Sequence, residues 1–561
     1  MVDIVDYRGR PANRSTSGGW TSALFIIGVE IAERFAFYGI SSNLISYLTG
    51  PLGESMAMAA AALNAWNGVA SMLPLLGAFV ADSYLGRYRT IVIASLLYIL
   101  GLGTLTLSSM LRIVHPAKCG TACPPPPLQV ALFYVSLYLV AIAQGGHKPC
   151  VQAFGADQFD QNDPQERVAR SSFFNWWYFG ICCGVVVTLV ILSYVQDNIG
   201  WGLGFGIPCI VMLFALVLFV LGTRTYRFCL LQEENPFARI GKTLVALTRK
   251  RLGKLPITEL QSELMISGQR RTCGGDEGAV STVPHMDDVF DLRRCVRAVL
   301  NSVHQARRIE RVEETKGLVR LFPIWTTCLI YAVVFAQSST LFTKQGGTLD
   351  RRISSKLQVP PAALQSFIST SIIVSIPIYD RILVPVARKF SGLPSGITML
   401  QRIGTGMALS LISMVIAALV EMKRLKTARE FGLVDLPNAR IPMSLWWLVP
   451  QYVLFGVADV FTMVGLQEFF YDQVPDALRS LGLALYMSIF GIGSFISGFL
   501  ISVINKTTSR GGESWFSNNL NRAHLDYFYW LLAGLSMIEL VLYVYFTQAY
   551  VYKKKQDTAV M

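Results

Sequence analysis

Charged residues are scarce in this sequence. Only 15% of its 561 residues are Asp, Glu, Lys or Arg, whereas an ordinary soluble domain carries about 25%. Hydrophobic residues make up 52% of the chain, and its mean hydropathy is +0.45. This composition argues against a string of soluble domains and predicts a chain that resides in a lipid bilayer.

Motifs of enzymes and nucleotide-driven pumps are missing as well. The chain has five histidines and contains no GxSxG, Walker-loop or CxxC sequence. We therefore expect no catalytic activity, no metal and no cofactor. Without a nucleotide site, the energy for any transport has to come from an ion gradient.

Cysteine usage does not predict a disulfide framework. Most of the ten cysteines lie in apolar stretches, where a free Cys behaves as a small hydrophobe. Cys119 and Cys123 share a polar loop. A local disulfide between them is an open alternative if that loop faces an oxidising compartment.

Apolar residues gather in segments long enough to cross roughly 30 Å of hydrocarbon. The first six lie near residues 21–49, 59–81, 90–111, 128–150, 173–194 and 203–222. Six more lie near residues 319–342, 362–383, 396–422, 444–471, 481–504 and 527–547. Two groups of six apolar segments around a polar connector predict an all-α membrane protein of twelve transmembrane helices in two bundles. The domains expected are an N-terminus at 1–20, a bundle at 21–222, a linker at 223–317, a bundle at 318–547 and a tail at 548–561.

The net charge of +13 does not predict nucleic-acid binding. The Lys and Arg residues concentrate between the apolar segments, where the positive-inside rule places them on the cytosolic side. We expect both termini and the linker to be cytosolic, in the plasma or the vacuolar membrane. One loop departs from the rule, because the basic EMKRLKTARE at 421–430 would face outward.

Charges also occur inside the first predicted span. Glu30, Glu33 and Arg34 share one helix face with Tyr38. An ionised side chain at mid-bilayer costs about 2.5–3.5 kcal/mol, so it needs a partner or a hydrated cavity. An inert ion pair would explain one Glu and the Arg, but it would not explain the second Glu. We therefore favour a carboxylate that binds and releases protons.

Two further intramembrane charges lie in opposite halves. Lys148 ends the fourth span in QGGHKPC, and Glu468 lies in the tenth. The two glycines before Lys148 allow either close helix approach or a break that Pro149 would assist. We favour a break, which would turn the ammonium into a cavity, over the alternative of a Lys that snorkels to the interface. We expect Lys148 and Glu468 to form a charge pair that opens and closes as the halves rock.

An Asp followed by basic residues recurs after the second and eighth spans, in ADSYLGRYRT at 81–90 and YDRILVPVARKF at 379–390. Ion pairs there are predicted to hold one half against the other on the cytosolic side. Simple topology control by positive charge is the alternative. The predicted gating residues are Asp82, Arg87, Asp380 and Arg381.

Several stretches together resemble the proton-coupled oligopeptide transporter family of the major facilitator superfamily, and more closely its plant nitrate/peptide branch. They are EIAERFAFYG (30–39), GAFVADSYLGRYRT (77–90), GGHKPCVQAFGADQFD (145–160), FFNWWYFG (173–180) and QEFFYDQVP (467–475). The resemblance implies a major facilitator fold, alternating access and solute import with protons. By position, it implies that Glu30, Glu33 and Arg34 couple protons, that Lys148 communicates with them, and that Glu468 faces the substrate. Lys148 and Glu468 are the charged candidates for substrate binding.

The seventh span departs from both substrate branches. It reads VVFAQSST at 333–340, whereas the peptide branch resembles QEQGS, so that its acid falls at Ala336. Nitrate members have His where this chain has Phe335. Gln337 and Tyr38 remain as candidate substrate contacts. The solute is therefore left open among nitrate, a di- or tripeptide and another small organic molecule.

The sequence thus predicts a proton-coupled symporter whose partners are a small solute, protons and membrane lipid, with no nucleic acid. Two alternatives remain. One is a membrane sensor or receptor that binds solute without productive transport, and the other is a passive channel. Paired charges weigh against a channel, because a channel has no sites to couple.

Overall fold

The computed structural model describes residues 4–13, 17–114, 125–160, 163–229, 320–352, 358–392, 396–437, 439–474, 479–511 and 514–550. The chain divides into two compact units. The first unit comprises residues 1–232, 323–473 and 479–561, and the second comprises 233–322 and 474–478. Of the second unit only 320–322 and 474 are described. Most of the predicted linker, the pair Cys119 and Cys123, and the end of the tail lie outside the described residues.

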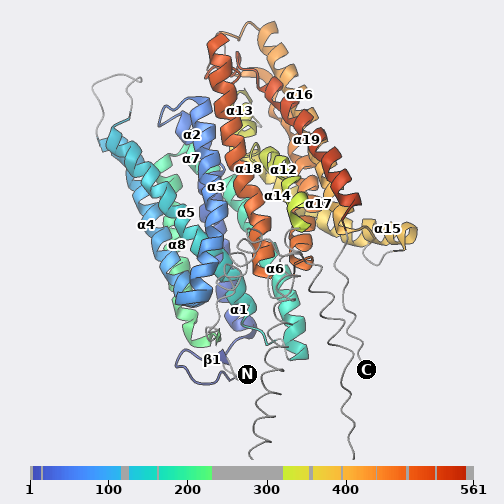
Figure 1. Cartoon of the computed structure of the whole chain (residues 1–561). Coiled ribbons are helices and arrows are strands. Elements are labelled where there is room, and N and C mark those ends of the chain that lie inside the picture. The colour runs from blue at the N-terminus through green and yellow to red at the C-terminus, as the bar shows by residue number, and fades with distance from the viewer. Residues whose placement is uncertain are drawn as a thin grey trace, which may run out of the picture. The chain divides into compact units, whose positions relative to one another are not determined.

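Helices of the first half run from blue to green in Figure 1. They are α1 (Gly19–Ser41), α2 (Leu44–Thr49), α3 (Met56–Val80) with η1 (Ala81–Leu85), α4 (Arg87–Val114), α5 (Pro127–Ala156), α6 (Pro164–Val187) with η2 (Thr188–Leu192) and α7 (Ser193–Asn198), and α8 (Trp201–Leu221) with η3 (Gly222–Thr225). Local sequence features, such as side-chain caps and prolines, mark where these helices begin. The Asp163 side chain caps α6 by accepting from the Gln165 amide at 2.8 Å, and Pro164 takes the first helical position.

Helices of the second half run from yellow to red in Figure 1. They are α12 (Leu329–Phe335), α13 (Leu341–Gly347), η4 (Pro361–Gln365) with α14 (Ser366–Ile378), η5 (Tyr379–Leu383) with α15 (Val384–Ser391), α16 (Met399–Glu430), η6 (Leu445–Leu448) with α17 (Val449–Asp472), α18 (Arg479–Thr508) with η8 (Ser509–Gly511), and α19 (Leu525–Gln548). Thr398 and Gln401 form a reciprocal capping box at the start of α16.

The twelve-helix prediction is confirmed. Within the described ranges, ten helices are long and apolar enough to cross a bilayer. The remaining two spans are α1, which carries three charged residues, and the shorter apolar helix Arg320–Phe335.

Two short strand pairs join segments that are far apart in the sequence. The pair β1 (Ile4–Val5) and β2 (Phe228–Cys229) is antiparallel, and the pair β3 (Leu349–Asp350) and β4 (Ile441–Ser444) is parallel. Beside the first pair, the buried Arg227 contacts Glu166 through Nη1 at 2.7 Å and Nη2 at 3.1 Å. Its Nε donates to the Ser17 carbonyl at 3.0 Å. One arginine therefore fastens the N-terminal segment, the start of α6 and the exit of α8 together.

Glycines allow α3 and α5 to pack closely. A Cβ on Gly77 would overlap with the Gly145 carbonyl, and a Cβ on Gly145 would lie 2.6 Å from Leu73 Cβ. The helix α5 continues unbroken through Pro149 to Ala156. The predicted break before Lys148 is therefore wrong, because the glycines serve the contact with α3, which supports a continuous helix.

The two halves meet along helices that are far apart in sequence. The helix α3 packs on α18, and α6 packs on α14; Figure 1 shows α3 beside α18. Asn64 donates to Ser497 Oγ at 3.0 Å, and a Cβ on Gly68 would lie 2.7 Å from the Phe495 ring.

The expected basic loop at 421–430 is the last part of α16. Arg424 is fully buried there, and its Nη2 lies 2.6 Å from Glu421 Oε1. The Lys423 ammonium sits 3.2 Å from the centroid of the Trp447 ring. An internal ion pair cancels part of the positive charge, which explains the apparent departure from the positive-inside pattern.

Candidate functional site

The three charges of α1 form one buried cluster. Glu30 and Glu33 are 2% and 0% exposed, and Arg34 is 7% exposed. Arg34 Nε donates to Glu30 Oε1 at 2.8 Å and lies 3.3 Å from Glu33 Oε2. From α4, the Tyr98 hydroxyl donates to Glu33 Oε1 at 3.4 Å. The helical spacing seen in the sequence therefore brings these side chains together as expected.

The cluster has more carboxylates than cations. With both Glu ionised and Arg34 charged, it carries one uncompensated negative charge in a buried place. The Oε2 atoms of Glu30 and Glu33 accept no hydrogen bond from the described residues. A buried carboxylate without enough donors is costly, so binding one proton relieves it.

Lys148 lies beside this cluster on α5. Its side chain is half-buried and interacts electrostatically with Arg34, Glu33 and Glu30. Within the described ranges it makes no hydrogen bond or ion pair. Tyr38, one turn beyond Arg34, is half-buried and interacts electrostatically with Arg34 and with Asp459 of α17.

Glu468 lies elsewhere. It is 48% exposed near the end of α17 and pairs with Arg402 of α16, whose Nη1 lies 3.5 Å from Glu468 Oε2. Arg402 also stacks over the Tyr379 ring, 4.3 Å from its centroid. The structure therefore does not form the predicted pair of Lys148 and Glu468, because an arginine of the same half neutralises the Glu.

Asp459 is an intramembrane acid that the sequence analysis missed. It lies mid-way along α17, is 2% exposed and accepts a hydrogen bond from the Tyr331 hydroxyl of α12. Tyr486 of α18 interacts with it electrostatically. The signal was present, since Asp459 is a lone acid in the apolar run FGVADVFTMVG, the same feature that marked Glu30.

Phe335 ends α12, and Gln337 lies in the turn between α12 and α13. The Phe335 ring packs on Phe455 at 6.0 Å and on Phe490 at 5.3 Å. The buried Gln337 donates to Ser497 Oγ at 2.9 Å. The Ser338 and Thr340 hydroxyls bond carbonyls of the preceding turn, which competes with a continuous helix. An aromatic surface therefore adjoins Asp459, because Tyr331 also stacks on Phe455.

The predicted gating residues do not bridge the halves. Arg87 Nε lies 3.5 Å from Asp82 Oδ1, and Arg87 also pairs with Asp157 at the end of α5. These three residues belong to one half, so they fasten its own loops together. Asp380 and Arg381 in η5 are exposed and take part in no ion pair within the described ranges.

Apart from Asn64 and Ser497, the polar contacts between the halves within the described residues lie at the loops after spans one, five, seven and eleven. We call this side of the molecule the closed side. Lys344 Nζ donates to Thr49 Oγ1 at 2.7 Å, and Gln365 Nε2 donates to the Ser42 carbonyl at 2.9 Å. Loops of the same parity lie on the same side of a membrane, opposite to both termini. Two more contacts share this side: the Met56 amide donates to Asn518 Oδ1 at 2.9 Å, and Arg351 Nη1 lies 3.9 Å from Asp197 Oδ2.

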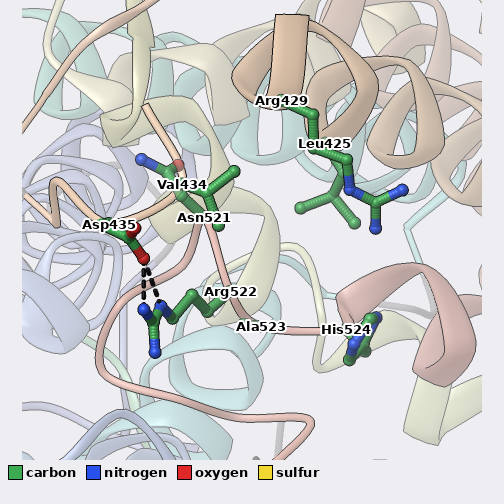
Figure 2. A pocket seen from close by; sticks show the side chains of 8 residues that line it. All are labelled: Leu425, Arg429, Val434, Asp435, Asn521, Arg522, Ala523 and His524. Atoms are coloured by element: carbon green, nitrogen blue, oxygen red, sulfur yellow. Dashed lines mark hydrogen bonds and ion pairs between the residues drawn. The ribbon is translucent and has the colours of Figure 1, made fainter. Parts of the chain in front are cut away.

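Two cavities lie apart from these residues. One of about 270 Å³ is lined by the end of α16 and the loop before α19 (Figure 2). Figure 2 shows the guanidinium of Arg522 turned to Asp435, with which it forms an ion pair. The other, of about 760 Å³, is an apolar groove between α1 and α6. Neither is lined by a predicted site residue.

Comparison with known proteins identifies the fold and its relatives. A family model described as PTR2, POT family, matches residues 88–516. The chain belongs to the POT family. It is 60% identical over 567 residues to Protein NRT1/PTR FAMILY 5.10 of Arabidopsis thaliana, covering 100% of this chain and 98% of that protein. The resemblance seen in the sequence is confirmed.

Solved POT family structures share the fold. A crystal structure of an auto-inhibited POT family peptide transporter aligns with a TM-score of 0.71 at 21% identity, covering 96% of this chain and 99% of that one. A POT family transporter in complex with 5-aminolevulinic acid aligns with a TM-score of 0.62 at 17% identity, covering 94% and 96%. This chain is therefore a multi-pass integral membrane transporter with the POT fold.

Proposed function

We propose that this transporter is a proton-coupled symporter that moves a small organic solute by alternating access, with both termini in the cytosol. The observation that carries the proposal is the surplus carboxylate of the Glu30, Glu33 and Arg34 cluster. These three buried side chains carry one net negative charge, which one added proton would neutralise. The contacts that Arg34 makes with Glu30 and Glu33 therefore depend on proton binding.

Protonation changes the partners that Arg34 prefers. While both carboxylates are ionised, Arg34 is held between them at 2.8 and 3.3 Å. A proton on one carboxylate weakens that hold and leaves the guanidinium free to interact with other groups. The two protonation states then favour different arrangements of the halves, which is the requirement for coupling. Closing a neutral site also costs less than closing one with an unpaired charge.

The charged groups of the two halves favour a zwitterionic or dipolar organic solute over nitrate alone. Lys148 offers an ammonium from one half, and Asp459 offers a carboxylate from the other. Tyr38 and Phe335 add aromatic surface. Because the Phe335 side chain is uncharged, it offers no positive charge to bind an anion such as nitrate. A molecule with both an acidic and a basic group matches the pair, as a di- or tripeptide does.

Contacts on the closed side support alternating access. Lys344 and Gln365 join the halves there. The ion pairs of Arg87 on the opposite side stay within one half. This distribution is the one expected of a conformation closed to one side of the membrane.

Uptake into proteoliposomes with an imposed pH gradient tests the proposal. The panel consists of labelled nitrate, labelled dialanine and labelled 5-aminolevulinic acid. Accumulation of any of them that follows the proton gradient supports symport. Saturable binding without flux supports a receptor or sensor, and flux that ignores the gradient supports a channel; either result overturns the proposal.

A further inference from the structure

A buried histidine adjoins the carboxylate cluster, and the coupling scheme above does not use it. His147 of α5 is 0% exposed. One of its ring nitrogens, one oxygen of Glu30 and one oxygen of Glu33 lie within 4.8 Å of one another. Neither ring nitrogen forms a hydrogen bond within the described part of the chain.

This arrangement is unfavourable for a permanently neutral imidazole. A neutral ring has one donor and one acceptor, and both are unused here although the residue is fully buried. In the neighbouring carboxylates, Oε2 of Glu30 and Oε2 of Glu33 also accept no hydrogen bond, although Glu33 Oε2 lies 3.3 Å from Arg34 Nε. An imidazolium would supply the missing donor to these oxygens. The unused ring nitrogens of His147 and the unused carboxylate oxygens therefore match a site that binds and releases a proton.

The charges around His147 limit the cluster to one extra proton. The helix α1 presents Glu30, Glu33 and Arg34, which sum to one negative charge. From α4, Tyr98 packs edge-on with its ring centroid 6.5 Å from that of His147. The next residue on α5 is Lys148, whose ammonium acts on the same carboxylates. One proton makes the two carboxylates, Arg34 and His147 neutral together. The Lys148 ammonium adds a further positive charge, which opposes the binding of a second proton.

A metal ion is the competing occupant of three such ligands. Arg34 weighs against it, because its guanidinium already lies 2.8 Å from Glu30 and 3.3 Å from Glu33. A divalent cation among these ligands would face that fixed positive charge at close range.

We propose that His147 is a proton-relay residue of the transporter. It accepts a proton on its free ring nitrogen and releases one from the other nitrogen to a carboxylate oxygen of Glu30 or Glu33. The ring returns to neutral, the carboxylate becomes a carboxylic acid, and no electron is transferred. While it is charged, His147 competes with Arg34 for Glu30. This inference rests on the proposed proton coupling.

The transport test compares His147→Gln with His524→Gln, the same substitution in a loop outside the cluster. Gln fills a similar volume but binds no proton. We expect gradient-driven uptake by His147→Gln to fall by about tenfold or more, with its pH dependence altered. Counterflow exchange without a gradient should match the wild type, which also shows that the variant folds. Wild-type uptake and pH dependence in His147→Gln would overturn the proposal.

A second measurement does not depend on transport. The protein is labelled at its histidine rings, placed in nanodiscs and studied by NMR, which follows the signals of its five histidines. The signal that is lost in His147→Gln is assigned to His147. We expect the His147 signal to titrate with pH and its midpoint to move in Glu33→Gln. A signal that does not titrate, or that ignores Glu33→Gln, would overturn the relay.

The two tests separate the two proposals. Suppose that the wild type shows no gradient-driven uptake, but that the His147 signal titrates and its midpoint moves in Glu33→Gln. Proton coupling to transport then fails, and the proton exchange at His147 stands. Stoichiometric binding of Zn²⁺ that is lost in His147→Gln would assign the cluster to a metal and overturn the relay.

Discussion

At the scale of single residues, burial of charge decides the site. The cluster of Glu30, Glu33 and Arg34 was predictable, because three charges in an apolar run stand out and helix geometry places them on one face. The partner of Glu468 was not predictable, since its arginine lies on α16, far away in sequence. Tyr331 was also hidden, because nothing local shows that its hydroxyl reaches Asp459.

Tyr331→Phe tests the place of Asp459 in solute binding. The variant removes the hydrogen bond to a buried carboxylate, an interaction of about 1.5–3 kcal/mol. We expect the apparent KM for the transported solute to rise about 10- to 100-fold while the protein stays folded. Tyr527→Phe, at a half-exposed tyrosine of α19, is the matched control. An unchanged KM in Tyr331→Phe would remove Asp459 from the binding site.

At the scale of elements, hydropathy predicted which segments are helices, but packing decided their shape. The glycines before Lys148 were compatible with a break or with close approach, and only the position of α3 selects close approach. The break in the seventh span was not predicted. It depends on the hydroxyls of Ser338 and Thr340, which bond carbonyls of the preceding turn.

Gly77→Ala tests the contact of α3 with α5. The added methyl group would overlap with the Gly145 carbonyl, and overpacking of this kind typically costs about 1–3 kcal/mol. We expect a lower melting temperature in detergent. Gly534→Ala is the control, because a Cβ there meets nothing within 4 Å, and it should leave the melting temperature equal or slightly higher. Equal melting temperatures for Gly77→Ala and the wild type would contradict the packing.

At the scale of the whole transporter, the two-by-six organisation followed from the sequence, whereas the contacts between the halves did not. Asp82 and Arg87 were expected to bridge the halves, but both belong to one half and pair there. The residues that do bridge, such as Lys344 of α13 and Thr49 of α2, are polar groups of short helices without a distinguishing sequence pattern. Pairing between distant segments is a property of the assembled fold.

Lys344→Met tests the closed side. It removes a hydrogen bond from a charged donor to Thr49, which contributes about 1.5–3 kcal/mol to this conformation. We expect faster hydrogen exchange in α2 and α13, measured by mass spectrometry, because the closed conformation becomes less populated. Lys506→Met, at an exposed position near the end of α18, should leave exchange in these helices unchanged. No difference between the two variants would show that this contact does not hold the side closed.

The most direct test of the central claim is gradient-driven uptake by Glu33→Gln in proteoliposomes. Glutamine keeps the shape of Glu33 but removes its charge and its proton, so uptake should no longer respond to an imposed pH gradient while counterflow exchange continues. Glu430→Gln, at the exposed end of α16, should behave as the wild type. Uptake by Glu33→Gln that still follows the proton gradient would contradict the account.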